Sequence, residues 1–255
     1  MTLKNRAPSI ALVLLLATCG VARADGQADL RAALARLQGQ APLKANAQAR
    51  DWRRTGEGKE AKETQGQARI SLEDGPRGLQ PLYGRDLLDR VDAEARAAAR
   101  DKSAPKPLAQ ALAQLGFGEL HALSSAASAL QREIDDARFK AETAESWGGK
   151  PARKLEFEGS VDSLSESNRK YVREFKLVLS VWIAADGTPL ASQRHFDVTG
   201  RAFVVVSFEQ HSDEQRAYAV AGDRLVATSD EEKGSAKGAG EAQEYRIERS
   251  LQVLP

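Results

Sequence analysis

Cysteine is almost absent from this chain of 255 residues, which has a single one, Cys19. Because this residue lies near the start of the chain, residues 25–255 contain neither a thiol nor a disulfide. A folded domain without disulfides must rely on a hydrophobic core. Residues 25–255 are enough to form one.

Histidine is also scarce, with three residues in the chain: His121, His195 and His211. None has the spacing of a metal-ligand motif, and no thiol is available to complete a zinc site. We expect His195 to be a partly buried structural residue between Val178 and Val206, and His211 to lie in a turn. The sequence therefore predicts no metal site and no cofactor.

The common catalytic motifs are missing. There is no Gly-x-Ser-x-Gly elbow and no phosphate-binding P-loop. Ser103/Lys106 and Ser167/Lys170 have Ser-x-x-Lys spacing, but their polar surroundings favour a solvated lysine rather than the deprotonated amine that catalysis needs. We predict that the protein is not an enzyme.

An excess of charge of either sign is lacking as well. The 37 basic and 36 acidic residues give a net charge of +1 and are interspersed. This balance argues against a nucleic-acid partner. Beyond the first residues, no apolar run is long enough to span a membrane as a helix.

The N-terminal residues have the three parts of a secretory signal. Lys4 and Arg6 supply positive charge, residues 10–16 form an apolar core, and Ala22-Arg23-Ala24 is a small-x-small cleavage site. We expect cleavage after Ala24, which makes residues 1–24 a signal peptide. As an alternative, residues 16–19 resemble the lipobox of bacterial lipoproteins, which would leave the chain anchored at a lipidated Cys19, although threonine before the cysteine fits poorly.

The first half of residues 25–255 alternates between helical and strand patterns. Apolar spacing predicts a helix over 29–38 and an insert of helices over about 84–145, the longest of them over 120–141. Strict alternation over 44–50 and 65–73 predicts two strands joined as a hairpin.

From residue 153 onward the pattern is that of an antiparallel meander. Asp186-Gly187 is a strong hairpin turn, and taking it as the loop places Leu177 opposite Phe196, Phe175 opposite Val198 and Lys176 opposite Asp197. Further strands are expected at 216–221, 225–228 and 245–253. Residues 230–243, rich in Gly, Ala, Glu and Lys, are expected to form a flexible loop.

A second turn at Gly200-Arg201 would align the next strand with the first two. One sheet face would then carry a contiguous apolar patch, the candidate ligand-binding residues Phe175, Leu177, Phe196, Val198, Phe203 and Val205.

A basic cluster at residues 50–54 is the other candidate site. Trp52, Arg53 and Arg54 could contact lipid headgroups or an acidic partner; the alternative is a strand end in which the arginines stack on Trp52.

Three segments carry a family resemblance: the helix at 29–37, the strand ending Arg69-Ile70-Ser71-Leu72, and the Asp-Gly hairpin at 181–190. With the order of elements, they make the chain similar to the outer-membrane lipoprotein carrier (LolA/LolB) superfamily. The long helical insert departs from it, as does Glu73-Asp74-Gly75-Pro76-Arg77 where Lys-Pro is usual.

The order of elements predicts a single α+β domain over 25–255, and the resemblance implies a curved, half-barrel-like antiparallel sheet. Helices inserted after the first hairpin would cover its concave face. It implies a non-enzymatic protein of the Gram-negative periplasm that holds a lipid or a lipoprotein acyl chain between sheet and helices. The alternative is an envelope protein-interaction or structural module without a small ligand. The oligomeric state stays open.

Overall fold

A computed structural model describes residues 25–39, 41–202 and 206–255. Its strands are β1 (Leu43–Thr55), β2 (Lys62–Gly75), β3 (Gly78–Leu82), β4 (Ala137–Trp147), β5 (Lys150–Gly159), β6 (Val172–Ile183), β7 (Pro189–Ala202), β8 (Val206–Ala221), β9 (Arg224–Gly238) and β10 (Glu241–Val253). Its α-helices are α1 (Gly26–Arg36), α2 (Arg85–Arg100), α3 (Pro107–Ala113), α4 (Phe117–Ser124), α5 (Ala126–Asp135) and α6 (Glu166–Arg169). Two single 3-10 turns, η1 (Gly58–Glu60) and η2 (Val161–Ser163), complete the described elements.

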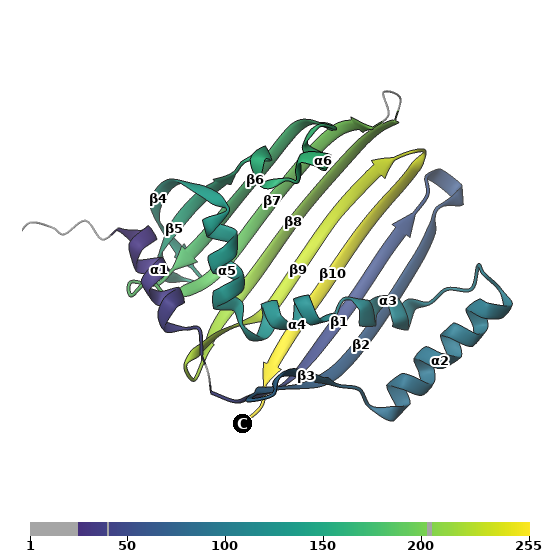
Figure 1. Ribbon diagram of the computed structural model, residues 1–255, viewed down its shortest axis with the longest axis horizontal. Helices are drawn as coiled ribbons and strands as arrows, with labels where there is room; N and C mark the ends of the chain where they lie inside the picture. The colour runs from purple at the N-terminus through teal and green to yellow at the C-terminus, as the bar shows by residue number, and fades with distance from the viewer. Residues whose placement is uncertain (1–24, 40, 203–205) are drawn as a thin grey trace, which may run out of the picture.

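The strands form one antiparallel sheet of ten, in the order β3-β2-β1-β10-β9-β8-β7-β6-β5-β4. Among the described residues no pairing joins β3 to β4, so the sheet is open. Helices α1, α3, α4 and α5 pack on one face of the sheet, which we call the inner face, and α2 contacts α3 (Figure 1). The predicted α+β class, with helices inserted after the first hairpin on one face of an antiparallel sheet, is confirmed.

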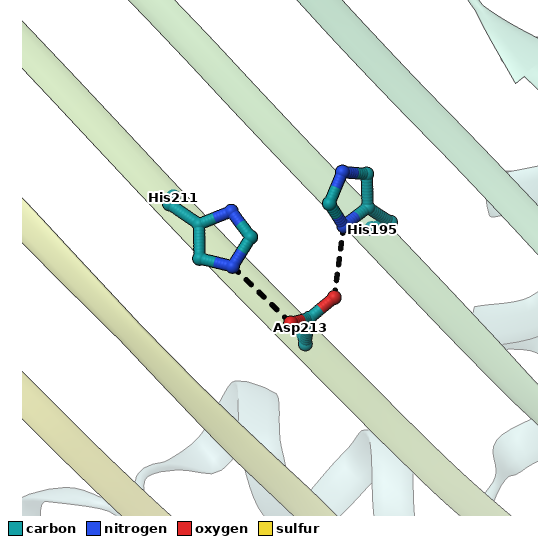
Figure 2. A group of neighbouring side chains, drawn as sticks. All are labelled: His195, His211 and Asp213. Atoms are coloured by element: carbon teal, nitrogen blue, oxygen red, sulfur yellow. Dashed lines mark hydrogen bonds and ion pairs between the residues drawn. The ribbon is translucent and has the colours of Figure 1, made fainter.

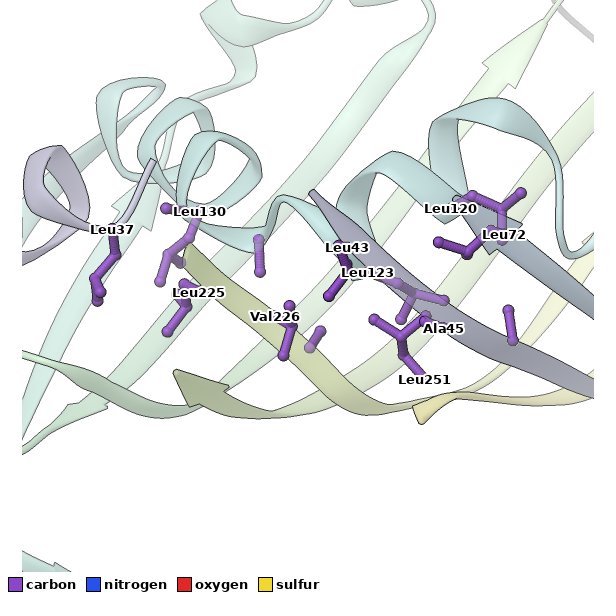
Figure 3. Packing of buried hydrophobic residues seen from close by; sticks show 14 of the residues in the cluster. Leu37, Leu43, Ala45, Leu72, Leu120, Leu123, Leu130, Leu225, Val226 and Leu251 are labelled. Atoms are coloured by element: carbon purple, nitrogen blue, oxygen red, sulfur yellow. The ribbon is translucent and has the colours of Figure 1, made fainter. Parts of the chain in front are cut away.

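Small residues let the helices approach the sheet closely. Ala45, Ala47 and Ala49 alternate along β1 and are fully buried on the inner face. At Gly66 of β2 a Cβ atom would lie 1.8 Å from the carbonyl oxygen of Pro107 in α3, so only glycine allows this helix to lie where it does. The close approach buries leucines of α4 and α5, such as Leu123 and Leu130, against Leu225 and Leu251 of the sheet (Figure 3).

The helical prediction for 120–141 is wrong beyond Asp135. The chain forms two helices, α4 and α5, and residues 137–147 are strand β4. Ala, Glu and Lys favour helix locally, but β4 pairs along its length with β5 through a tight turn at Gly148-Gly149, where both glycines have positive φ. Tertiary pairing therefore overrides local propensity, and the helical insert covers 85–135 rather than 84–145. A short strand, β3, precedes it and was not predicted.

The predicted loop at 230–243 is also wrong. Residues 230–238 belong to β9, which pairs with β8 on one side and β10 on the other. Only Ala239-Gly240 separates β9 from β10. The segment lacks β-branched side chains, and its strand conformation comes from the backbone hydrogen bonds that both neighbours supply.

The signal segment predicted for residues 1–24 lies outside the described residues. Asp25, the first described residue, caps α1: its carboxylate accepts hydrogen bonds from the amides of Gln27 and Ala28 at 3.1 and 3.2 Å. None of the described helices combines the length and apolarity needed to cross a bilayer.

Candidate functional site

Four of the predicted ligand-binding residues lie together on the inner face of β6 and β7. Leu177 is opposite Phe196 and Phe175 is opposite Val198, as the Asp-Gly hairpin predicts. The rings of Phe175 and Phe196 meet edge to face, with centroids 5.7 Å apart. The first predicted turn therefore places these side chains correctly.

Two further phenylalanines extend this surface across β5 and β4. Phe157 and Phe139 lie opposite each other, with ring centroids 5.6 Å apart. Gly159 leaves room for Leu177 to lie across β5, because a Cβ atom there would be 2.3 Å from a Leu177 methyl carbon. We call this surface the apolar strip; its members are Phe139, Phe157, Phe175, Leu177, Phe196 and Val198.

The apolar strip is only partly covered. Figure 1 shows α1 and α5 over one end of β4–β7 and the short α6 toward the other. Phe157 and Val198 are buried, whereas Phe175, Leu177 and Phe196 keep part of their surface exposed. The strip is therefore an apolar surface on the helix side of the sheet that the helices leave incompletely closed.

The second predicted turn is wrong, and it changes what adjoins the strip. Phe203 and Val205 lie outside the described residues. Val198 lies opposite Gln210 and Phe196 opposite Ser212, at the positions that the prediction gave to Phe203 and Val205. Because β7 continues to Ala202, β8 brings polar side chains to the inner face beside the strip.

Beyond the strip, the inner face holds a network of charged side chains. Arg194 donates to Glu214 at 2.8 Å, Arg216 bonds Glu214 and reaches Glu133 of α5 at 2.5 Å, and Arg249 donates to Asp230 at 3.0 Å. We call this the charged network; it comprises Arg194, Arg216, Arg249, Glu133, Glu214, Asp230 and Glu232. Sequence reasoning missed this network; a local signal was the spacing of Glu214 and Arg216, two residues apart and therefore on one face of β8.

The charged network has more carboxylates than guanidinium groups. Burial, together with the nearby carboxylate of Glu214, raises the pKa of Asp230 to about 6. Burial alone would lower the pKa of Arg216, but Glu214 and Glu133 raise that pKa above its ordinary value, so Arg216 stays charged. One oxygen of Asp230, Oδ1, is buried without a hydrogen-bond partner among the described residues, which fits a carboxyl group that takes up a proton readily.

The predicted surface cluster at 52–54 is divided between the two faces of the sheet. Successive side chains of a strand point to opposite faces. Arg53 points to the inner face and pairs with Asp51 at 3.0 Å, while Trp52 and Arg54 point outward. On the outer face, a depression of about 670 Å³ is lined by Arg50, Trp52, Gln65, Gln67, Arg246 and Glu248. A contact role for Trp52, Arg53 and Arg54 stays a prediction.

Two histidines gather on the outer face of β7 and β8, where the sequence prediction did not place them. His195 lies opposite Asp213 and His211 lies opposite Asp197. The expected position of His195 beside Val178 is confirmed, but its other neighbour is Asp213 rather than Val206, and His211 lies within β8 rather than in a turn. Figure 2 shows Asp213 between the two imidazole rings.

A sequence signal for this cluster existed. His-Phe-Asp at 195–197 and His-Ser-Asp at 211–213 each place a histidine and an aspartate on the same face of a strand, two residues apart. The two His-x-Asp patterns lie side by side only in the β7–β8 register that the structure has. The incorrect prediction of a turn at Gly200-Arg201 therefore concealed the histidine cluster.

The comparisons with known proteins add one structural likeness. No family model matches the chain, and no curated protein matches its sequence. Among solved structures, it is similar to a LolA superfamily protein from Nitrosomonas europaea, with 13% identity over 90% of this chain and 94% of that one, and a TM-score of 0.28. The superfamily is the one that the sequence resembles. At that TM-score the likeness supports no conclusion about function, and the proposals below rest on the described residues.

Proposed function

We propose that this protein is a non-enzymatic periplasmic carrier that shelters an apolar chain, from a lipid or a lipoprotein, on the apolar strip. The observation that carries the proposal is the part-exposed surface of Phe175, Leu177 and Phe196, adjacent to one another on the face where helices bury most other apolar side chains. Covering such surface with an acyl chain is favourable by about 25 cal/mol for each Å² removed from water.

The edge of the strip offers a cation for a polar headgroup. Arg194 lies two residues from Phe196 on the same strand and therefore on the same face. Its side chain is 37% exposed although it pairs with Glu214. A carboxylate or phosphate headgroup could bind the free edge of this guanidinium while the acyl chain covers the phenylalanines.

The cellular location is part of the same proposal. The predicted signal peptide at 1–24 would export the chain to the periplasm of a Gram-negative bacterium, and lipidation at Cys19 would instead tether it to a membrane there. Either form would meet lipids and lipoproteins as partners.

The experiment has two parts. Native mass spectrometry of protein purified gently from the cell envelope, followed by lipid extraction, should show a mass excess that resolves to a lipid. The purified protein should also bind cis-parinaric acid, a fluorescent fatty acid. We expect Leu177→Gln to weaken that binding at least about tenfold, since burying a polar group without a partner costs roughly 1–3 kcal/mol.

Val220→Gln is the matched control, because Val220 is an apolar residue that is already 49% exposed and lies outside the strip. Circular dichroism would establish that both variants are folded. A folded Leu177→Gln protein that binds the probe as tightly as wild type would contradict the proposal.

A second candidate is an envelope protein-interaction module without a small ligand. It is favoured by the closed packing beneath α4 and α5, where Leu120, Leu123 and Leu130 are almost fully buried. A bare polypeptide mass from the envelope, together with no binding of cis-parinaric acid, would favour this alternative.

A further inference from the structure

The four-residue cluster on the outer face has the composition of a transition-metal site. It comprises His195 and Asp197 of β7 and His211 and Asp213 of β8, held opposite one another by the antiparallel register. Two imidazoles and two carboxylates are ligands that Zn²⁺ and its neighbours accept. The cluster lies on the face opposite the apolar strip, so it is independent of the proposed lipid site.

Three of these side chains converge on one point. Nδ1 of His195 lies 2.8 Å from Oδ1 of Asp213, and Nε2 of His211 lies 3.2 Å from Oδ2 of the same residue. One ligand atom from each of the three lies within 4.8 Å of the others. Ligands of a tetrahedral ion at about 2.0–2.2 Å lie roughly 3.3–3.6 Å apart, so small side-chain rotations would admit an ion (Figure 2).

Asp197 occupies the position of an outer-shell carboxylate. It lies 2.6 Å from Nε2 of His195 and 2.6 Å from Nδ1 of His211, the ring nitrogens that face away from Asp213. Metal-bound histidines usually donate their second N–H to a carboxylate, which fixes the tautomer and orients the ring. Here one aspartate holds both rings in that way.

We propose that His195, His211 and Asp213 bind one divalent transition-metal ion of the Zn²⁺ class, with Asp197 as the shared outer-shell partner. Three protein ligands leave a fourth position for water or for a donor from a partner molecule. The site is reachable, because the four side chains are between 26% and 41% exposed.

Binding is an exchange of protons for the metal ion. The imidazole nitrogens that face Asp213 can bind the ion only without a proton, so any proton on them is released to solvent as the ion binds, and two carboxylates balance the double charge of the ion. Lys176 lies opposite Asp197 and Lys233 opposite Asp213. Both lysines are exposed, so their ammonium groups can turn into solvent when the ion binds.

The test is calorimetric titration of tag-free, chelator-treated protein with Zn²⁺ alone, repeated with Co²⁺ while its visible absorption is recorded. We expect one ion per chain. We expect His211→Ala and Asp213→Ala to weaken binding at least about 100-fold. Asp197→Asn should weaken it about 10- to 100-fold, as loss of an outer-shell partner does, with the stoichiometry unchanged.

His121→Ala is the matched control, since His121 lies on α4 against Phe117, away from the cluster, and it should bind like wild type. If a cluster variant fails to fold, NMR spectra of the wild-type protein test the proposal instead. The imidazole signals of His195 and His211 should shift when Zn²⁺ is added, and those of His121 should not. Absence of saturable binding by wild type, or shifts confined to His121, would overturn the proposal.

Discussion

Asp230 is the single residue whose protonation matters most for the charged network. It lies between Arg249 at 3.0 Å and Arg216 at 3.7 Å, and it is 2% exposed. Two arginines would ordinarily keep such a carboxyl group ionised. Burial and the competing carboxylates of the network reverse that tendency and raise its pKa to about 6.

This raised pKa predicts how stability changes with pH. Between pH 3.8 and about 6, Asp230 is mostly protonated in the folded protein but mostly ionised in the unfolded protein. The contribution of Asp230 to the free energy of unfolding is therefore fully present below that window and declines as pH rises through about 6. The full change is on the order of 2–3 kcal/mol.

The measurement compares wild type with Asp230→Asn by urea unfolding at several pH values from acid to neutral. The stability of wild type relative to the variant should fall as pH rises. The comparison cancels the trend of groups that both proteins share. A difference that does not change with pH would contradict the assigned pKa direction.

Arg216 gives a second prediction at this scale. Its guanidinium bonds Glu214 and Glu133 and has 13% of its side chain exposed. Arg216→Met leaves carboxylates buried without their partner, and we expect it to lower the free energy of unfolding by about 3–5 kcal/mol. Arg50→Met, which breaks the exposed pair with Glu248 at 3.5 Å, should cost less than about 1 kcal/mol. Equal losses in urea unfolding would show that the network contributes no more than a surface pair.

At the scale of elements, the register of β7 and β8 decides which side chains meet. The Asp-Gly turn predicts the β6–β7 pairing because its conformation ties loop length to register. Gly200-Arg201 resembles a turn locally, but both residues lie in β7, opposite Phe208 and Ser207. The misplaced turn gave Val198 and Phe196 the wrong partners on β8, and it concealed the histidine cluster.

The contact between α3 and β2 gives a prediction for one element pair. Gly66→Ala would put a methyl group 1.8 Å from the carbonyl oxygen of Pro107, so α3 must move away from the sheet. We expect a loss of about 1–3 kcal/mol in thermal or urea unfolding.

Gly118→Ala is the matched control for that substitution. Gly118 lies in α4 with open space around its Cβ position. Alanine there should be neutral or stabilising by up to about 1 kcal/mol, because it favours helix. A loss at Gly118 equal to that at Gly66 would mean that the close approach of α3 is not the cause.

At the scale of the whole molecule, the predicted signal segment gives a prediction about where the mature chain begins. We expect the mass of protein recovered from the envelope to correspond to a chain that starts at Asp25. A lipidated chain that starts at Cys19 would have a larger mass and would partition with membranes. Intact mass spectrometry distinguishes the two, and a chain that retains residue 1 would contradict both.

The sequence alone was sufficient for features with local causes. The apolar spacing indicates α1, although the helix runs from Gly26 to Arg36 rather than over 29–38, and the β6–β7 register follows from Asp186-Gly187. The order of helix, hairpin, helical insert and meander was also readable, because hydrophobic periodicity reflects which face of each element is buried.

Only the tertiary structure decided the features that depend on partners distant in sequence. Residues 137–147 and 230–238 are strands because neighbouring strands satisfy their backbone groups. Arg216 and Asp230 are buried because Glu133, Glu214 and Arg249 lie around them. The two His-x-Asp pairs form one cluster because the β7–β8 register aligns them. In each case the deciding energy is an interaction between segments, which no local pattern records.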